Sequence, residues 1–163
     1  MGRIVGAVLL GYVAMALTVF LGLSLAFVGL GPDRAFRPGV FEVSTLWVAV
    51  SVIVGFGAAL AGGWVARRIA RRATGPRVLA GVVFVLGAAL ALATLAGGGP
   101  EATGPRTEGI GTFEAMQFAQ TPFRVMLANP LIGALGVLLG GSALRTEQAS
   151  ATDSQGQSYP GAA

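Results

Sequence analysis

The chain of 163 residues is strongly apolar and basic, with 54% hydrophobic residues, 11% charged residues, a mean hydropathy of +0.75 and a net charge of +4. A soluble domain carries about 25% charged residues because water must wet its surface, so this composition excludes an ordinary soluble fold and indicates a membrane protein. Cysteine and histidine are both absent. The chain therefore lacks the side chains for disulfides, thiolate nucleophiles, thiolate-held metals and the usual haem ligation, and we predict no cofactor and no metal site.

The first predicted element is a membrane-spanning helix over residues 4–30, which are apolar and uncharged. At about 1.5 Å per residue this stretch exceeds the roughly 30 Å hydrocarbon core of a bilayer. A cleavable signal peptide has an apolar region of only about 7–15 residues, so we interpret the segment as a retained anchor. Gly31 and Pro32 are expected to end the helix, because Gly serves as a cap and Pro prevents continuation. Residues 33–39 predict a short polar loop.

A second span is predicted over residues 44–66, with Trp47 near one end and Trp64 near the other, as in the aromatic belts of membrane interfaces. The arginine-rich residues 67–72 are expected to continue this helix into water. A Thr-Gly-Pro turn at 74–76 leads to a third span over 78–96. The Gly-Gly-Gly-Pro run that follows should end it, since neither residue type supports a continued helix.

A fourth span is predicted over residues 123–144. In the connection before it, residues 112–120 predict a short helix lying on the outer membrane surface, with Thr112 as N-cap and Glu114 in the first turn. A lid over a site or a docking face is the functional alternative for this helix. Residues 145–163 are polar and rich in Gly, Ser and Gln, which predicts a disordered tail. The predicted fold class is all-α, an integral membrane four-helix bundle over residues 1–144.

The arginines predict the orientation, because cytoplasmic loops of membrane proteins are enriched in basic residues. The densest group lies between the second and third spans, and placing it in the cytoplasm also places Arg3, Arg145 and both termini there. The same group predicts contact with anionic lipid headgroups, at about 1 kcal/mol per Arg near the surface. The residues predicted to make this contact are Arg67, Arg68, Arg71 and Arg72. We predict no nucleic-acid partner, because no basic patch is interleaved with aromatic residues.

Small residues form stripes within the second and fourth spans. In lipid, such stripes let helix backbones approach closely. We interpret them as packing faces inside one bundle, and the alternative is a surface for a homo-oligomer or for another membrane subunit. The residues of these predicted faces are Gly133, Gly136, Gly140, Gly55, Ala59 and Gly62.

The Asn129-Pro130 pair in the fourth span is a candidate helix break. Pro130 lacks the N–H that would bond to the carbonyl of Met126, so a kink is expected. Asn129 could cap a broken helix of the kind that presents backbone groups to ligands in transporters. We interpret the pair as a packing kink, with a ligand contact as the alternative. Tyr12 in the first span is a further candidate contact, interpreted first as a helix–helix hydrogen bond.

No Asp, Glu, Lys, Arg or His lies within residues 4–30, 45–66, 78–96 or 125–144. Ionisable residues inside a bilayer usually mark ion paths or binding sites, so their absence argues against an ion-coupled transporter and a buried acid–base enzyme. We expect a non-catalytic membrane component that self-associates or joins a membrane complex. The alternative is a small oligomeric channel or facilitator that uses the kinked fourth helix, and an enzyme working from outer-surface carboxylates ranks third.

Two stretches carry a resemblance to a known group of proteins. Residues 31–39 read Gly-Pro-Asp-Arg-Ala-Phe-Arg-Pro-Gly, and residues 129–133 read Asn-Pro-Leu-Ile-Gly before the Gly pair at 140–141. With these motifs, the layout of some 145 residues resembles small four-span proteins of the bacterial inner membrane that have no assigned activity. The resemblance implies a location in that membrane and no particular chemistry.

Overall fold

The computed structural model describes residues 2–38, 42–98 and 123–156. Its helical elements are α1 (Gly2–Leu30), α2 (Pro32–Ala35), α3 (Thr45–Ala70), α4 (Thr74–Ala93), the π-helical turn η1 (Thr94–Gly98) and α6 (Phe123–Gly156). Four segments are long and apolar enough to cross a membrane: Gly2–Leu30, Thr45–Ala70, Thr74–Gly97 and Arg124–Ala143. The predicted all-α class with four apolar helices is confirmed, whereas membrane insertion and orientation stay predictions.

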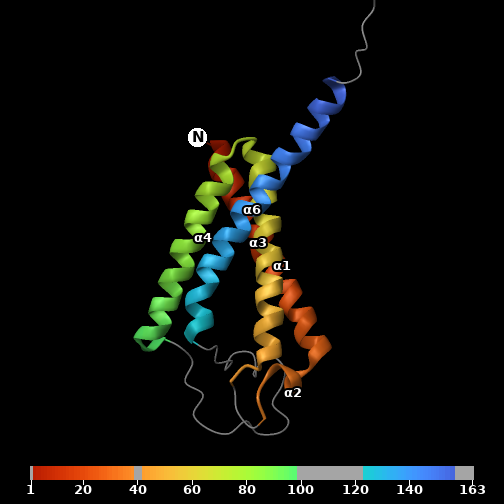
Figure 1. Ribbon diagram of the computed structural model, residues 1–163. Coiled ribbons are helices and arrows are strands. Elements are labelled where there is room, and N and C mark those ends of the chain that lie inside the picture. The colour runs from red at the N-terminus through yellow and green to blue at the C-terminus, as the bar shows by residue number, and fades with distance from the viewer. Residues whose placement is uncertain (1, 39–41, 99–122, 157–163) are drawn as a thin grey trace, which may run out of the picture.

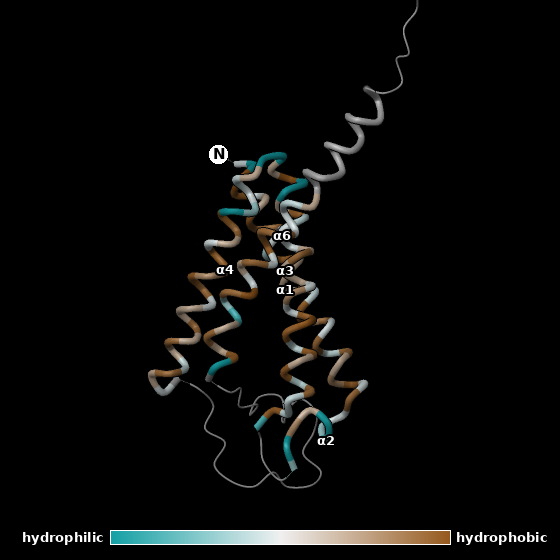
Figure 2. Tube along the Cα trace, viewed as in Figure 1, coloured by the Kyte–Doolittle hydropathy of each residue, from teal (hydrophilic) through white to brown (hydrophobic). Residues whose placement is uncertain are grey.

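The four long helices run in alternating directions (Figure 1). The start of α1, the turn between α3 and α4, and the C-terminal part of α6 lie at one end, called here the N-terminal end. The short helix α2 and the turn η1 lie at the opposite end, called here the α2 end (Figure 1). Hydrophilic residues gather at these two ends and apolar residues fill the length between them (Figure 2). This distribution is the one expected when lipid surrounds the middle of a helical bundle.

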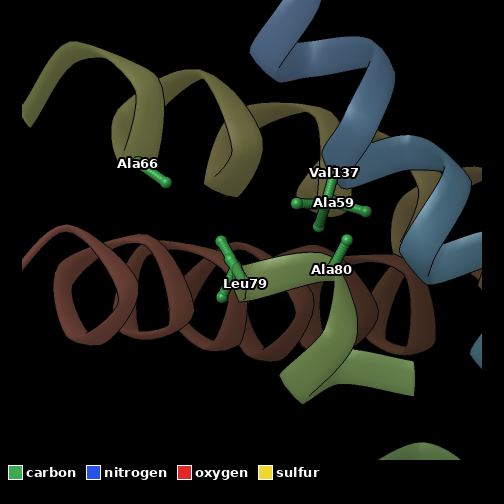
Figure 3. Packing of buried hydrophobic residues seen from close by; sticks show 5 residues of the cluster. All are labelled: Ala59, Ala66, Leu79, Ala80 and Val137. Atoms are coloured by element: carbon green, nitrogen blue, oxygen red, sulfur yellow. The ribbon is translucent and has the colours of Figure 1, made fainter. Parts of the chain in front are cut away.

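Helix α3 contacts both α1 and α6, and α4 packs mainly against α6. The largest buried cluster joins side chains of α3, α4 and α6, and half-buried Val8 and Met15 of α1 pack against it. Its buried members are Ala59, Ala66, Leu79, Ala80 and Val137 (Figure 3). Most of these side chains are small, so the helices meet nearly backbone to backbone. Lipid tails are as apolar as the protein, so close packing stabilises such a bundle more than burial of apolar area does.

Large apolar side chains point away from this core. Leu25, Val28 and Ile53 are 73%, 78% and 71% exposed. Among the residues with described side chains, no polar or charged residue is buried. An apolar outer surface around a core of small residues is the reverse of a soluble domain, in which large apolar side chains are mostly inside.

The end of α1 matches the sequence prediction, but the loop after it is more ordered than predicted. Gly31 takes a φ of 72° and its N–H donates to the carbonyl of Phe27 at 2.9 Å. The segment predicted as a polar loop then begins with α2, in which Pro32 occupies the first helical position. Proline suits this position because its N–H would have no partner there in any case. An isolated antiparallel bridge pairs Phe36 with Val43.

The turn between α3 and α4 falls earlier than predicted. Helix α3 ends at Ala70, and Arg71 takes a left-handed conformation with a φ of 54° while its N–H donates to the carbonyl of Arg67 at 2.9 Å. The prediction that the helix continues through residue 72 is therefore wrong. Residues 74–76, predicted as the turn, form the first turn of α4 instead. Pro76 is compatible with this place, since the first turn of a helix needs no N–H from it.

Helix α6 is longer and more continuous than predicted. It passes through Pro130 without a break and runs on to Gly156, so the backbone of residues 145–156, predicted to be disordered, is helical. Ala, Leu, Arg, Glu and Gln favour helix, and neither Gly nor Pro interrupts residues 142–155, which accounts for the extension. The predicted surface helix at 112–120 and the tail residues 157–163 lie outside the described residues. The Gly run after the third span acts as predicted, because Gly97 leaves the helical conformation with a φ of 95°.

Candidate functional site

The closest helix crossing joins α3 and α6 through reciprocal glycines. A Cβ atom on Gly140 would collide with the backbone carbonyl of Leu60, and one on Gly63 would collide with the carbonyl of Val137. One turn before Gly140, a Cβ on Gly136 would lie 2.7 Å from the Cβ of Ala59. At such crossings Cα–H groups contact carbonyl oxygens, with about 0.5–1 kcal/mol for each contact. The structure therefore brings together the sequence-predicted residues Ala59, Gly136 and Gly140.

Helices α1 and α3 meet at a second reciprocal pair. A Cβ on Gly11 would lie 2.9 Å from the carbonyl oxygen of Gly62, and a Cβ on Gly62 would lie 2.9 Å from the carbonyl oxygen of Gly11. Gly62 belongs to the predicted packing faces, whereas Gly11 and Gly63 do not. The signal for both was present in the sequence, because Ala7 precedes Gly11 and Ala59 precedes Gly63 by one i, i+4 step.

The two remaining glycines of the predicted faces differ in whether another helix lies against them. A Cβ on Gly133 would lie 3.1 Å from Val83 of α4, so this residue faces a neighbouring helix. Outside its own turns of helix, the half-buried Gly55 has no atom within 4 Å of its Cβ position. The same is true of Gly57 in α3 and Gly81 in α4, and both are exposed. These three glycines therefore lie on surfaces that no described helix of this chain covers.

The candidate ligand contacts do not come together. Pro130 is buried, and its ring lies 3.1 Å from the Cβ position of Gly87 in α4. Asn129 beside it is exposed. Tyr12 is 40% exposed on α1, and its hydroxyl has no hydrogen bond to the described residues. Tyr12 lies in the half of α1 nearer the N-terminal end, whereas Asn129 and Pro130 are near the start of α6 at the α2 end. The structure thus places Pro130 in helix packing and separates Tyr12 from it.

The arginine group lies where α3 gives way to α4, at the N-terminal end (Figure 1). Arg67 and Arg68 occupy the last turn of α3, Arg71 and Arg72 lie in the turn, and Arg77 is in the first turns of α4. The Arg68 guanidinium carbon lies 4.6 Å from the centre of the Trp64 ring. Such a cation–π contact is worth about 0.5–1 kcal/mol at an exposed site. Because α3 ends at Ala70, the four predicted lipid-contacting arginines do not share one helix face.

The α2 end carries a small core that the sequence analysis did not identify. Phe27 is 1% exposed and packs edge-on against Phe36 and Trp47, with ring centres 6.1 and 5.4 Å apart. Buried Ala35 and Val43 complete the cluster. The Ser44 hydroxyl donates to the carbonyl of Arg34 at 2.6 Å and accepts the N–H of Trp47 at 3.1 Å. One residue thus caps α3 and ties it to α2, and a Ser just before an apolar run was the sequence signal for this cap.

Four helices of the described chain are long and apolar enough to cross a membrane, which suggests a multi-pass membrane protein. Comparisons with protein-family models, with curated proteins and with solved structures found no match.

Proposed function

We propose that the protein is a non-catalytic component of a membrane that associates with itself or with another membrane protein. The observation that carries the proposal is the division of the small residues into two groups. Gly11, Gly62, Gly63 and Gly140 close the crossings between helices of the chain. Other glycines occupy helix surfaces on which nothing lies within 4 Å of the Cβ position.

The outward group supports association with a further helix. Gly57 on α3 and Gly81 on α4 are exposed and have open Cβ positions. The exposed Ile53 lies four residues before Gly57 and the exposed Val85 four residues after Gly81, so each glycine shares a helix face with a large apolar side chain. Membrane helices associate chiefly where small residues let backbones approach, as the inward group of this chain illustrates. Outward small residues beside large apolar ones offer the same kind of surface to a second copy or to another subunit.

The packing of Pro130 supports this proposal over a channel or facilitator. A proline that opened a path would expose freed backbone groups to a cavity. Here the Pro130 ring lies against Gly87, a residue small enough to receive it. The apolar stretches of all four predicted spans also lack ionisable side chains, which are the usual parts of proton relays and buried acid–base sites.

The distribution of arginine favours a cytoplasmic location for both termini. The group between α3 and α4 lies at the same end as Arg3, which favours a cytoplasmic position for the whole N-terminal end. The resemblance to four-span proteins of the bacterial inner membrane favours that membrane as the location.

Affinity capture of the tagged protein from native membranes in mild detergent, followed by native mass spectrometry, tests the proposal. We expect a homo-oligomer or a stoichiometric complex with another membrane protein. Gly57→Leu and Gly81→Leu should weaken the complex, because a large side chain fills an outward small-residue position. Val13→Leu enlarges an exposed side chain of α1 without filling a small-residue position, and as the control it should leave the complex intact. A monodisperse monomer with no partner would contradict the proposal.

A further inference from the structure

The most strongly charged surface of the described chain is the basic patch at the N-terminal end, defined by Arg67, Arg68, Arg71, Arg72 and Arg77. These arginines have no acidic counterpart nearby in sequence, since residues 43–100 contain neither Asp nor Glu. In the described part of the chain none of them forms an ion pair. The arginines at the α2 end differ, because Arg37 donates to the carboxylate of Glu42 at 2.9 Å. Among the described side chains, the charge of the basic patch is therefore uncompensated.

Helix dipoles account for only part of this patch. Arg67 and Arg68 lie in the last turn of α3, where the partial negative charge of the helix end favours a cation. Arg77 lies near the start of α4, where the partial positive charge disfavours one, and the first turn of α4 has no acidic residue. Arg71 and Arg72 belong to neither helix. The last three arginines are therefore placed where an anion from outside the chain would lower the electrostatic energy.

The position of Trp64 indicates the depth in the bilayer at which such an anion would bind. It lies six residues before the end of α3, about 9 Å along the helix axis at 1.5 Å per residue. Trp64 is 40% exposed, and its ring lies under the Arg68 guanidinium. An indole that faces outward between an apolar helix and a charged one-turn extension is typical of the headgroup level of a bilayer. The phosphates of lipid headgroups lie at this level, so they are the anions that favour a lipid as the ligand.

We propose that the basic patch and Trp64 form a binding site for an anionic phospholipid, with the phosphate at the arginines of the α3–α4 turn and the acyl chains along α3 beside Trp64. Arginine suits this role because its planar guanidinium can give two hydrogen bonds to one phosphate. The inference rests on the membrane location in the proposed function and adds to it a ligand class and a site. Partner binding elsewhere on the molecule is independent of it.

The two tryptophans of the chain lie at opposite ends of α3, which makes a direct test possible. Trp47→Phe leaves Trp64 as the reporter, and Trp64→Phe leaves Trp47. Each variant is placed in phosphatidylcholine nanodiscs that contain the same minor fraction of either brominated phosphatidylglycerol or brominated phosphatidylcholine, and quenching of tryptophan fluorescence is compared. The planar discs make the direction of insertion irrelevant.

We expect brominated phosphatidylglycerol to be enriched about fivefold beside Trp64, which corresponds to about 1 kcal/mol, the usual gain for one arginine near an anionic surface. Beside Trp47 the two lipids should quench equally. The triple variant Arg68→Gln/Arg71→Gln/Arg72→Gln should lose the enrichment. Arg34→Gln removes an exposed arginine from the α2 end and is the control that should retain it. Native mass spectrometry of the chain with both tryptophans should show retained phosphatidylglycerol that the triple variant loses.

Each other result counts against the proposal. Equal quenching of Trp64 by the two lipids would overturn the lipid site while leaving the spans intact. Enrichment that persists in the triple variant would show that these three arginines do not bind the lipid. Displacement by inorganic phosphate beyond that by chloride at equal ionic strength would assign the patch to a free phosphate. If neither tryptophan is quenched, the membrane location fails, and with it the proposed function.

Discussion

Gly140 of α6 lies so close to the backbone carbonyl of Leu60 in α3 that no side-chain carbon can stand between them. Gly63 repeats the relationship in the other direction, against the carbonyl of Val137. The two helices thus touch through backbone at both places. This crossing links the α1–α3 half of the bundle to the α4–α6 half, so its geometry determines how the whole chain packs.

Gly140→Ala should destabilise the protein by about 1–3 kcal/mol or more, the usual range for overpacking a close contact, because the neighbouring atom is backbone and cannot rotate away. Gly57→Ala is the matched control on the partner helix, since nothing lies within 4 Å of its Cβ position. It should be neutral or stabilising by up to about 1 kcal/mol through helix propensity. Unfolding in mixed detergent and sodium dodecyl sulfate micelles measures both. Equal stability of the two variants would contradict the close contact between Gly140 and the backbone of α3.

Gly31→Ala tests the chain reversal after α1. Gly31 combines a φ of 72° with a ψ of 164°, a region that only glycine occupies readily. Alanine there should cost about 1–3 kcal/mol although the space around the Cβ position is open. Gly29→Ala, two residues earlier in α1 and equally open, should be neutral or slightly stabilising. A thermal unfolding midpoint in detergent that falls only for Gly31→Ala is the expected result, and equal midpoints would argue that the reversal is not strained.

The sequence predicted the long helices well because their signals are local. An uncharged apolar run longer than a bilayer core predicts a span whatever lies beside it. Gly31 and Gly97 end their helices because glycine readily adopts a positive φ. The turn after α3 was misplaced because Arg71 adopts a left-handed conformation that favours glycine, whereas the Gly75-Pro76 pair resembles a turn and is built into a helix. Helix α6 extends beyond the predicted span to Gly156, because residues 142–155 combine a polar composition, which predicts disorder, with residues that favour helix.

For the candidate sites too, the sequence shows which residues a segment contains but not which segments come together. A small residue in a membrane helix is visible in sequence, but which face it lies on is decided by the other helices. Gly55 and Gly62 lie on one helix, yet only Gly62 meets a neighbour. The Phe27 cluster was missed because it assembles from α1, α2 and the start of α3, and no spacing within one segment reveals that Phe36 and Trp47 share a partner.

Ser44→Ala tests the joint between α2 and α3. The substitution removes both the cap on the Trp47 N–H and the hydrogen bond to the Arg34 carbonyl, and the loss of an N-cap alone costs about 0.5–2 kcal/mol. Arg37→Gln nearby removes an ion pair whose side chains are 57% and 42% exposed, so it should cost under about 1 kcal/mol. In the Trp64→Phe background, emission from Trp47 should shift to longer wavelength for Ser44→Ala and stay unchanged for Arg37→Gln. An unchanged spectrum in both variants would show that the hydrogen bonds of Ser44 do not keep Trp47 in the aromatic cluster.

A double-mutant cycle on Gly87 and Pro130 tests whether the proline is a packing residue. Gly87→Ala alone should destabilise the protein, because the new Cβ would lie 3.1–3.2 Å from the Pro130 ring and both groups sit between packed helices. Pro130→Ala alone restores a backbone N–H that can bond to the Met126 carbonyl but leaves space beside Gly87. In the double variant the added methyl group fills that space, so the costs should not add, and a coupling of about 0.5–3 kcal/mol is expected for contacting residues. Additive costs would separate the two residues and return Pro130 to the list of candidate ligand contacts, where Asn129→Ala and flux measurements in liposomes would decide its role.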